Sequence, residues 1–208
     1  MFDKTQADVI VRTFCWKGHV KVTRELLDQQ LCTLFHIYGL EGTTIARLAE
    51  RMGLQKSSLY HYYPDGKDSM ARAVLEQYLQ WEESFNETAA QGPGSPRERL
   101  ERILANIRGV NTNPAQVSTL DVFTIGEARE RYLPWVQALY EKRRALLAKL
   151  ATEAGIVEPE LSERLDLFFI QFEGAHVMFR VLGNFEQFHR TLDSLPNVLL
   201  GFQAPTSD

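Results

Sequence analysis

Side chains that form hydrogen bonds occupy nearly every position of one short segment of this chain, residues 55–62. Lysine and glutamine side chains can pair with base edges in a groove of DNA, and short hydroxyl groups can reach either bases or phosphates. Tyrosine and histidine side chains can hold phosphates. The segment therefore has the side chains that nucleic-acid recognition requires. They belong to Gln55, Lys56, Ser57, Ser58, Tyr60, His61 and Tyr62.

The sequence around this segment predicts a helix-turn-helix over residues 43–63, which would position it. Thr43 or Thr44 can cap the first helix, because a threonine oxygen accepts from an otherwise unpaired backbone N–H. Gly53 can end that helix, because glycine adopts the left-handed conformation of a C-terminal turn without steric cost. Four apolar residues recur at helical spacing and would form the buried stripe: Ile45, Leu48, Ala49 and Met52. In this motif the second helix enters the major groove of DNA.

The composition is that of a soluble globular chain with a mild division of charge. Of the 208 residues, 44% are hydrophobic and 24% are charged, which argues against disorder. The net charge of −4 is unusual for a nucleic-acid binder. However, residues 1–80 carry ten Lys and Arg against nine Asp and Glu, whereas residues 81–208 carry thirteen against eighteen. Because DNA contact depends on local charge, this division is compatible with DNA binding by the first part.

The sequence lacks the marks of several other protein classes. The two cysteines, Cys15 and Cys32, are predicted to be reduced thiols, and no spacing of cysteine and histidine predicts a metal site. No run approaches the ~18 apolar residues of a membrane span, and residues 1–30 lack the core of a signal peptide. We therefore expect a cytoplasmic protein without a membrane, a cofactor or a metal as partner. A small helical enzyme is a competing hypothesis, but no catalytic pair supports it.

Periodic apolar residues predict an all-α fold with eight or nine helices from residue 23 onward. The first helix would end at Gly39, and a PDGK turn would precede a long helix that Asp68 opens. The segment QGPGSP is the strongest break, after which Ser95 would cap a new helix with Pro96 at its first position. The later helices are expected at about 114–126, 127–154, 161–182 and 185–202, with Pro134 kinking or dividing the second of these.

Residues 23–85 resemble the DNA-binding domain of TetR-family transcriptional regulators. The resemblance includes the helix before the helix-turn-helix and the basic residue after it, so it is more specific than the motif alone. The matching residues, in the family's order and near its spacing, are Leu27, Leu31, Phe35, Gly39, Thr44, Ile45, Leu48-Ala49, Gly53-Leu54, Leu59-Tyr60, Tyr63 and Lys67. Three features depart from the family's pattern: Leu31 stands where alanine is common, Gln55 stands where serine or threonine is common, and PDGK inserts residues before Lys67.

The resemblance implies an N-terminal three-helix helix-turn-helix domain at 23–66 and a helical effector-binding and dimerisation domain at 67–208. Residues 1–22 would be an extension, either a flexible arm or simply a longer start. The implied function is a sequence-specific transcriptional repressor that a small-molecule effector releases from a pseudo-palindromic operator. The open alternative is a DNA-binding regulator without such a switch, controlled by a partner protein or by its own abundance.

The expected DNA contacts divide into base readers and phosphate contacts. Lys56 and Gln55 are best suited to read bases, because lysine donates to guanine and glutamine pairs with adenine. Ser57 and Ser58 could serve either purpose. Phosphate contacts are expected, in part from the resemblance, at Thr44, Tyr60, His61, Tyr62 and Lys67, whereas Tyr63 is assigned to packing. One base contact gives only ~1–3 kcal/mol of discrimination, so a symmetric dimer on half-sites about 34–36 Å apart is expected.

The last two helices are too apolar for a solvated surface. The residues LDLFFIQFEGAHVMFRVLG place apolar groups on more than one face, so one face can cover the domain's own core and another a second subunit. The resemblance implies a homodimer through these two helices. The effector would be small and apolar or amphipathic, and its pocket candidates are Phe123, Trp135, Tyr140, Phe168, Phe172, His176 and Met178, which could equally be plain core.

Overall fold

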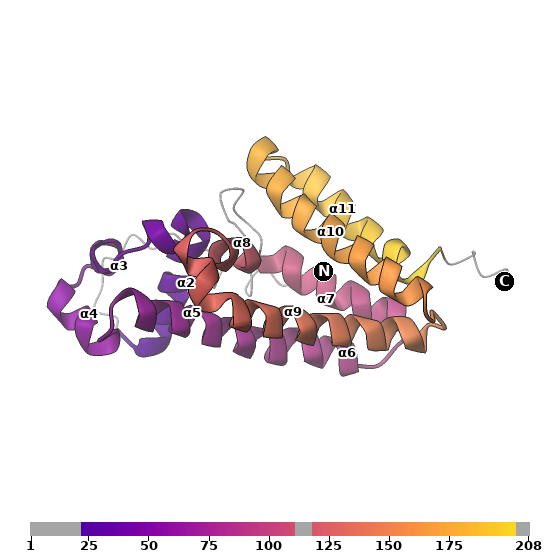
Figure 1. Ribbon diagram of the computed structural model, residues 1–208, viewed down its shortest axis with the longest axis horizontal. Helices are drawn as coiled ribbons and strands as arrows, with labels where there is room; N and C mark the ends of the chain where they lie inside the picture. Colours follow the sequence, from indigo (N-terminus) through magenta and orange to yellow (C-terminus); the bar gives the residue numbers. More distant parts are fainter. Residues whose placement is uncertain (1–21, 111–117, 203–208) are drawn as a thin grey trace. The chain divides into compact units, whose positions relative to one another are not determined.

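The computed structural model describes residues 22–110 and 118–202 of the chain. All regular structure in these ranges is helical, which confirms the all-α prediction (Figure 1). The extension at 1–21, Cys15 and the expected helix start at Pro114 lie outside the described residues. Cys32 is a free thiol, whose pKa burial raises to about 12, so it stays protonated at neutral pH.

The described residues form a succession of helices. Glu82–Glu87, labelled η1, forms a π-helical turn between α5 and α6. The α-helices are α2 (Arg24–Gly42), α3 (Ile45–Met52), α4 (Lys56–Tyr62), α5 (Lys67–Trp81), α6 (Thr88–Gln91), α7 (Pro96–Val110), α8 (Thr119–Thr124), α9 (Glu127–Glu153), α10 (Glu160–Leu182) and α11 (Phe185–Leu200).

The described residues divide into two compact units. The first contains residues 22–80 and 118–135, and the second contains 81–110 and 136–202. The first unit therefore includes α8 and the start of α9 in addition to the helix-turn-helix. The expected domain boundary between residues 66 and 67 lies within this first compact unit, and the division of function at that boundary stays a prediction.

The core of the first unit is built on the apolar stripe of α2. Four residues of this stripe are buried: Leu27, Leu31, Leu34 and Phe35. Phe35 contacts Phe123 of α8, with ring centroids 5.9 Å apart. Gly39 leaves the helical conformation at φ 67° and ψ −178°, so α2 changes direction where the sequence predicted its end. A residue with a side chain would be strained there, because this backbone region is open almost only to glycine.

The second unit has a core of aromatic and aliphatic side chains from α7, α9, α10 and α11. The start of α7 confirms the predicted cap: the backbone N–H of Glu98 donates to Ser95 Oγ at 3.3 Å, and the Glu98 carboxylate accepts from the Ser95 N–H at 2.7 Å. This reciprocal pair satisfies two backbone donors that the helix itself leaves open. Pro134 lies inside α9, which runs as one helix from Glu127 to Glu153.

Candidate nucleic-acid interface

The helix-turn-helix forms through the local interactions that the sequence predicts. Thr44 caps α3, because its hydroxyl oxygen accepts from the N–H of Arg47 at 3.2 Å. Gly53 ends α3 in the left-handed conformation at φ 63°, and the N–H of Leu54 donates to the carbonyl of Ala49 at 2.9 Å. This C-terminal turn reverses the chain into α4.

Helix α4 exposes the hydrogen-bonding side chains that the sequence singles out. Leu59 is its buried residue, and the half-buried Tyr62 lies with its ring against His61. The exposed side chains are Gln55, Lys56, Ser57, Ser58, Tyr60 and His61. Tyr63, which was assigned to packing, is fully buried. The predicted separation of polar and packing residues is therefore present, whereas the DNA contacts themselves stay a prediction.

A hollow of about 280 Å³ brings residues from α3, α4 and α5 together. It contains the capped N-terminus of α3, the side chains of Lys56 and Lys67 and the ring of Tyr60. Its lining residues are Thr43, Thr44, Ile45, Ala46, Lys56, Tyr60, Gly66, Lys67 and Met70. Two ammonium groups, the three hydroxyls of Thr43, Thr44 and Tyr60, and a helix N-terminus line this hollow, and the ammonium groups and the helix N-terminus favour an anion. The hollow therefore suits a phosphate group.

Lys67 is already bonded within the protein. Its Nζ donates to Glu41 Oε2 at 2.9 Å and to the carbonyl oxygen of Glu41 at 3.2 Å. The ion pair is largely exposed, so it is worth little in stability. It nevertheless places a carboxylate beside the hollow, where it would compete with a phosphate for Lys67.

Two arginines of the helix-turn-helix, both on α3, are further cationic candidates that the sequence pattern did not single out. Both Arg47 and Arg51 are exposed. The guanidinium of Arg47 stacks over the ring of Tyr38 at 4.1 Å from its centroid, and Arg51 Nε donates to Gln30 Oε1 at 2.6 Å. Their spacing of four residues, outside the apolar stripe of α3, was the available signal. They add two exposed positive charges to α3, on side chains that contact α2.

The structure separates the predicted pocket residues into three environments. Phe123 is fully buried in the first unit between Phe35 and Tyr132, and Trp135 of the same unit is about half exposed. In the second unit four of the residues belong to one chain of ring contacts, in which Phe169 joins Tyr140 to Phe168, and Phe172 and His176 follow. Met178 is exposed on α10. Their role in effector binding stays a prediction.

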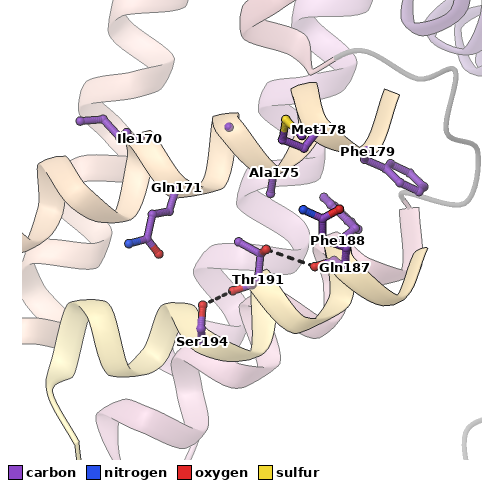
Figure 2. Close-up of a pocket in the computed structure, with 10 residues that line it drawn as sticks. Ile170, Gln171, Ala175, Met178, Phe179, Gln187, Phe188, Thr191 and Ser194 are labelled. Atoms are coloured by element: carbon purple, nitrogen blue, oxygen red, sulfur yellow. Dashed lines mark hydrogen bonds between the residues drawn. The ribbon is translucent and has the colours of Figure 1, made fainter. Parts of the chain in front are cut away.

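A groove of about 430 Å³ lies between α10 and α11, as Figure 2 shows. The Thr191 hydroxyl donates to the carbonyl of Gln187 at 3.1 Å, and the Ser194 hydroxyl donates to that of Thr191 at 2.7 Å. Because both hydroxyls are satisfied within α11, they leave the groove free to accept apolar groups. The lining residues are Ile170, Gln171, Gly174, Ala175, Met178, Phe179, Gln187, Phe188, Thr191 and Ser194.

The described part of the chain has neither a cluster of metal-ligating side chains nor a membrane-spanning helix. No group of three or more His, Cys, Asp or Glu side chains within it is placed to hold a metal ion. None of its helices is both long and apolar enough to span a membrane.

Comparison with known proteins gives concordant similarities. Residues 31–74 match the model of a family described as bacterial regulatory proteins, tetR family. The chain is 30% identical over 131 residues to the HTH-type transcriptional repressor KstR2 of Mycolicibacterium smegmatis. It is 35% identical over 83 residues to the HTH-type transcriptional regulator BetI 1 of Chromohalobacter salexigens. These matches cover 57% and 39% of this chain and only 63% and 40% of the two relatives.

A solved structure shares the fold over most of the chain. It is a cysteine-substituted variant of the TetR family transcriptional regulator CifR in complex with a 26 bp operator DNA. The TM-score is 0.68 at 18% identity, and the match covers 86% of this chain and 98% of the other. At this identity the likeness concerns the fold.

Proposed function

We propose that this chain, which belongs to the tetR family of bacterial regulatory proteins, binds operator DNA as a homodimer and represses transcription. The observation that carries the proposal is the exposed polar face of α4 next to the lysine-lined hollow at the N-terminus of α3. Base-reading donors and an anion site on one surface are what sequence-specific DNA binding requires. A variant of the similarly folded CifR is in complex with operator DNA, which supports operator binding as the function.

The side chains around the hollow would make different DNA contacts, according to their length and their chemistry. Lys56 and Gln55, exposed at the start of α4, would read base edges in the major groove. Thr44, Tyr60 and Lys67 would hold a phosphate in the hollow, which they line. Ser57 and Ser58 would contact bases or phosphates, and His61 and Tyr62 would contact the adjacent backbone.

The homodimer would form through α10 and α11. Helix α10 has a second apolar stripe, opposite the one buried in the core, and its members are exposed: Leu167, Ile170, Gly174, Val177, Met178 and Val181. An exposed stripe of this length indicates an interaction surface. Gly174 would permit close approach of a second helix, and the groove beside it accepts apolar side chains. Two subunits would place two copies of α4 on a pseudo-palindromic operator.

A small apolar or amphipathic effector would release the protein from DNA. The aromatic chain through Tyr140, Phe168, Phe172 and His176 is the part of the second unit that we propose to rearrange around it. Such an effector must favour the state that does not bind DNA, and moving a population from 1:99 to 99:1 requires about 5.5 kcal/mol of differential affinity. We expect the protein to act in the cytoplasm.

Selection of DNA from a random pool tests the proposal directly. We expect the full chain to enrich a pseudo-palindrome, because two symmetric copies of α4 would read it. Substitution Lys56→Ala should then relax the sequence preference by about 1–3 kcal/mol at one position of each half-site. Substitution Tyr60→Phe should instead weaken binding to all sequences similarly, because it removes a phosphate contact.

Fluorescence anisotropy titrations on the selected operator and on a scrambled duplex would separate these two effects. A chain that enriches no sequence would contradict the proposed function. Unchanged binding of both variants would contradict the assignment of α4 as the DNA-reading helix.

A further inference from the structure

Helix α4 has few anchors of its own. It contains seven residues, its N-cap residue Gln55 makes no side-chain cap bond, and Leu59 is its buried residue. Helices shorter than about 12–15 residues are marginal in isolation, so other elements must hold it in place. The angle at which α4 presents Lys56 and Tyr60 therefore depends on contacts at its ends.

A closed ring of polar contacts joins the C-terminal end of α4 to the first turns of α2. The Tyr63 hydroxyl donates to Asp28 Oδ1 at 2.7 Å. Arg24 Nε donates to both carboxylate oxygens of Asp28 at 2.9 Å, and its Nη1 donates to the carbonyl oxygen of Tyr62 at 2.8 Å. The guanidinium also lies over the Tyr63 ring, 4.7 Å from its centroid. We call Arg24, Asp28 and Tyr63 the Arg24 clamp.

The chemistry of the clamp makes each partner dependent on the others. Tyr63 is fully buried and Asp28 nearly so. Burial, followed by the hydrogen bond to Asp28, raises the pKa of Tyr63 above its usual range, so its hydroxyl remains the donor. The bond from Arg24 satisfies one of the carbonyls that the end of a helix leaves open. Removal of one partner would leave a buried polar group unpaired, and the end of α4 would shift to solvate it.

We propose that Arg24, Asp28 and Tyr63 are positioning residues, which set the orientation of α4 and thereby the affinity for the operator without themselves contacting DNA. The inference rests on the proposed function of α4. It also rests on two contacts of the clamp. Tyr63 and Asp28, which are 35 positions apart, are joined by a hydrogen bond, and Arg24 bonds to the backbone of the helix that is proposed to read DNA.

Two variants of the full chain test the clamp on the selected operator. Tyr63→Phe removes one hydroxyl and keeps the ring, and Arg24→Gln removes the guanidinium. We expect each to lower operator affinity about tenfold, which corresponds to about 1.4 kcal/mol. The slope of log affinity against log salt should not change, because no phosphate contact is removed.

Matched controls break similar contacts away from α4. Tyr132→Phe removes a hydroxyl that donates to Asp68 at 2.9 Å in the first unit. Arg99→Gln removes a guanidinium that joins the carbonyl oxygen of Ala90 to the Glu153 carboxylate in the second unit. We expect all four variants to lower the thermal midpoint of unfolding. The two controls should nevertheless keep operator affinity within about twofold, or 0.4 kcal/mol, of the wild-type value.

Three outcomes would count against the proposal. Operator affinity that stays unchanged in both clamp variants, with wild-type binding intact, would overturn the clamp alone. A salt slope reduced by about one in Arg24→Gln would overturn positioning in favour of a direct phosphate contact. A wild-type chain that binds no DNA would overturn the proposed function and the role of the clamp with it.

Discussion

Lys67 shows how the role of a single residue depends on its partner. Its side chain lines the anion-favouring hollow, but its ammonium group is bonded to the carboxylate and the carbonyl oxygen of Glu41. A phosphate that enters the hollow would meet the negative charge of Glu41 beside the positive charge of Lys67. Glu41 therefore lowers the contribution of Lys67 to DNA affinity. This effect is largest at low salt, where the charges of the pair are screened least.

Substitution Glu41→Gln should raise affinity for any DNA sequence. The amide keeps a hydrogen-bond acceptor for Lys67 but removes the charge, so we expect a two- to fivefold gain, about 0.4–1 kcal/mol, at low salt. Anisotropy titrations at several salt concentrations would measure it. Glu87→Gln is the control, because Glu87 pairs with Lys142 in the second unit. An equal gain in the control would indicate a general charge effect and contradict a phosphate at Lys67.

At the scale of the element, α3 and α4 differ in how their N-termini are satisfied. Thr44 caps α3 with its hydroxyl oxygen, whereas Gln55 begins α4 without a side-chain cap bond. Both helices are short, and their first N–H groups have no partner within the helix. The residue types account for this difference, because glutamine is a poorer cap than threonine. Helix α4 is therefore left to its C-terminal contacts, which the Arg24 clamp supplies.

Substitution Gln55→Ser should stabilise the first unit. Serine at the N-cap would accept from a free N–H of α4, with a gain of about 0.5–1 kcal/mol in the free energy of unfolding. Urea unfolding followed by circular dichroism would measure it. Thr44→Ala is the converse variant and should lose a similar amount, since its cap bond is present. A less stable Gln55→Ser variant would show that the glutamine has a structural contact of its own.

At the scale of the whole molecule, α10 carries more apolar surface than one subunit can bury. Phe168, Phe172 and Phe179 lie in the core of the second unit, while Ile170 and Val181 are each about 70% exposed on the other stripe. A helix with two apolar stripes needs a packing partner for each of them. The core supplies one, and in the proposed homodimer the second subunit supplies the other.

Substitution Ile170→Glu should therefore separate the subunits. A carboxylate within the apolar stripe would be buried without a partner in the dimer, which costs several kcal/mol. We expect a monomer by sedimentation velocity and at least a hundredfold loss of operator affinity, about 2.7 kcal/mol, because a single α4 would remain on each half-site. Thr152→Glu, which adds the same charge at an exposed position of α9, should remain dimeric. An Ile170→Glu protein that is still a dimer would contradict the interface.

Much of the fold and part of the candidate site could be predicted because they depend on near neighbours in the chain. The cap at Thr44, the left-handed turn at Gly53 and the reciprocal cap of Ser95 and Glu98 each act within four residues. Helical periodicity likewise indicated which residues of α2 and α3 are buried. The exposed face of α4 followed from the same periodicity.

By itself, the sequence determined the helices, their caps and the polar face of α4, because backbone hydrogen bonds and apolar periodicity act over one or two turns. Which distant residues meet depends on how the helices pack in three dimensions. Tyr63 forms a hydrogen bond with Asp28, Lys67 forms an ion pair with Glu41, and Phe123 packs against Phe35 in the first unit. The partners lie 26 to 88 positions apart in the chain, from Lys67 and Glu41 at the shortest separation to Phe123 and Phe35 at the longest. Such contacts depend on how whole helices pack against one another, and the spacing of residues within a single helix does not specify that packing.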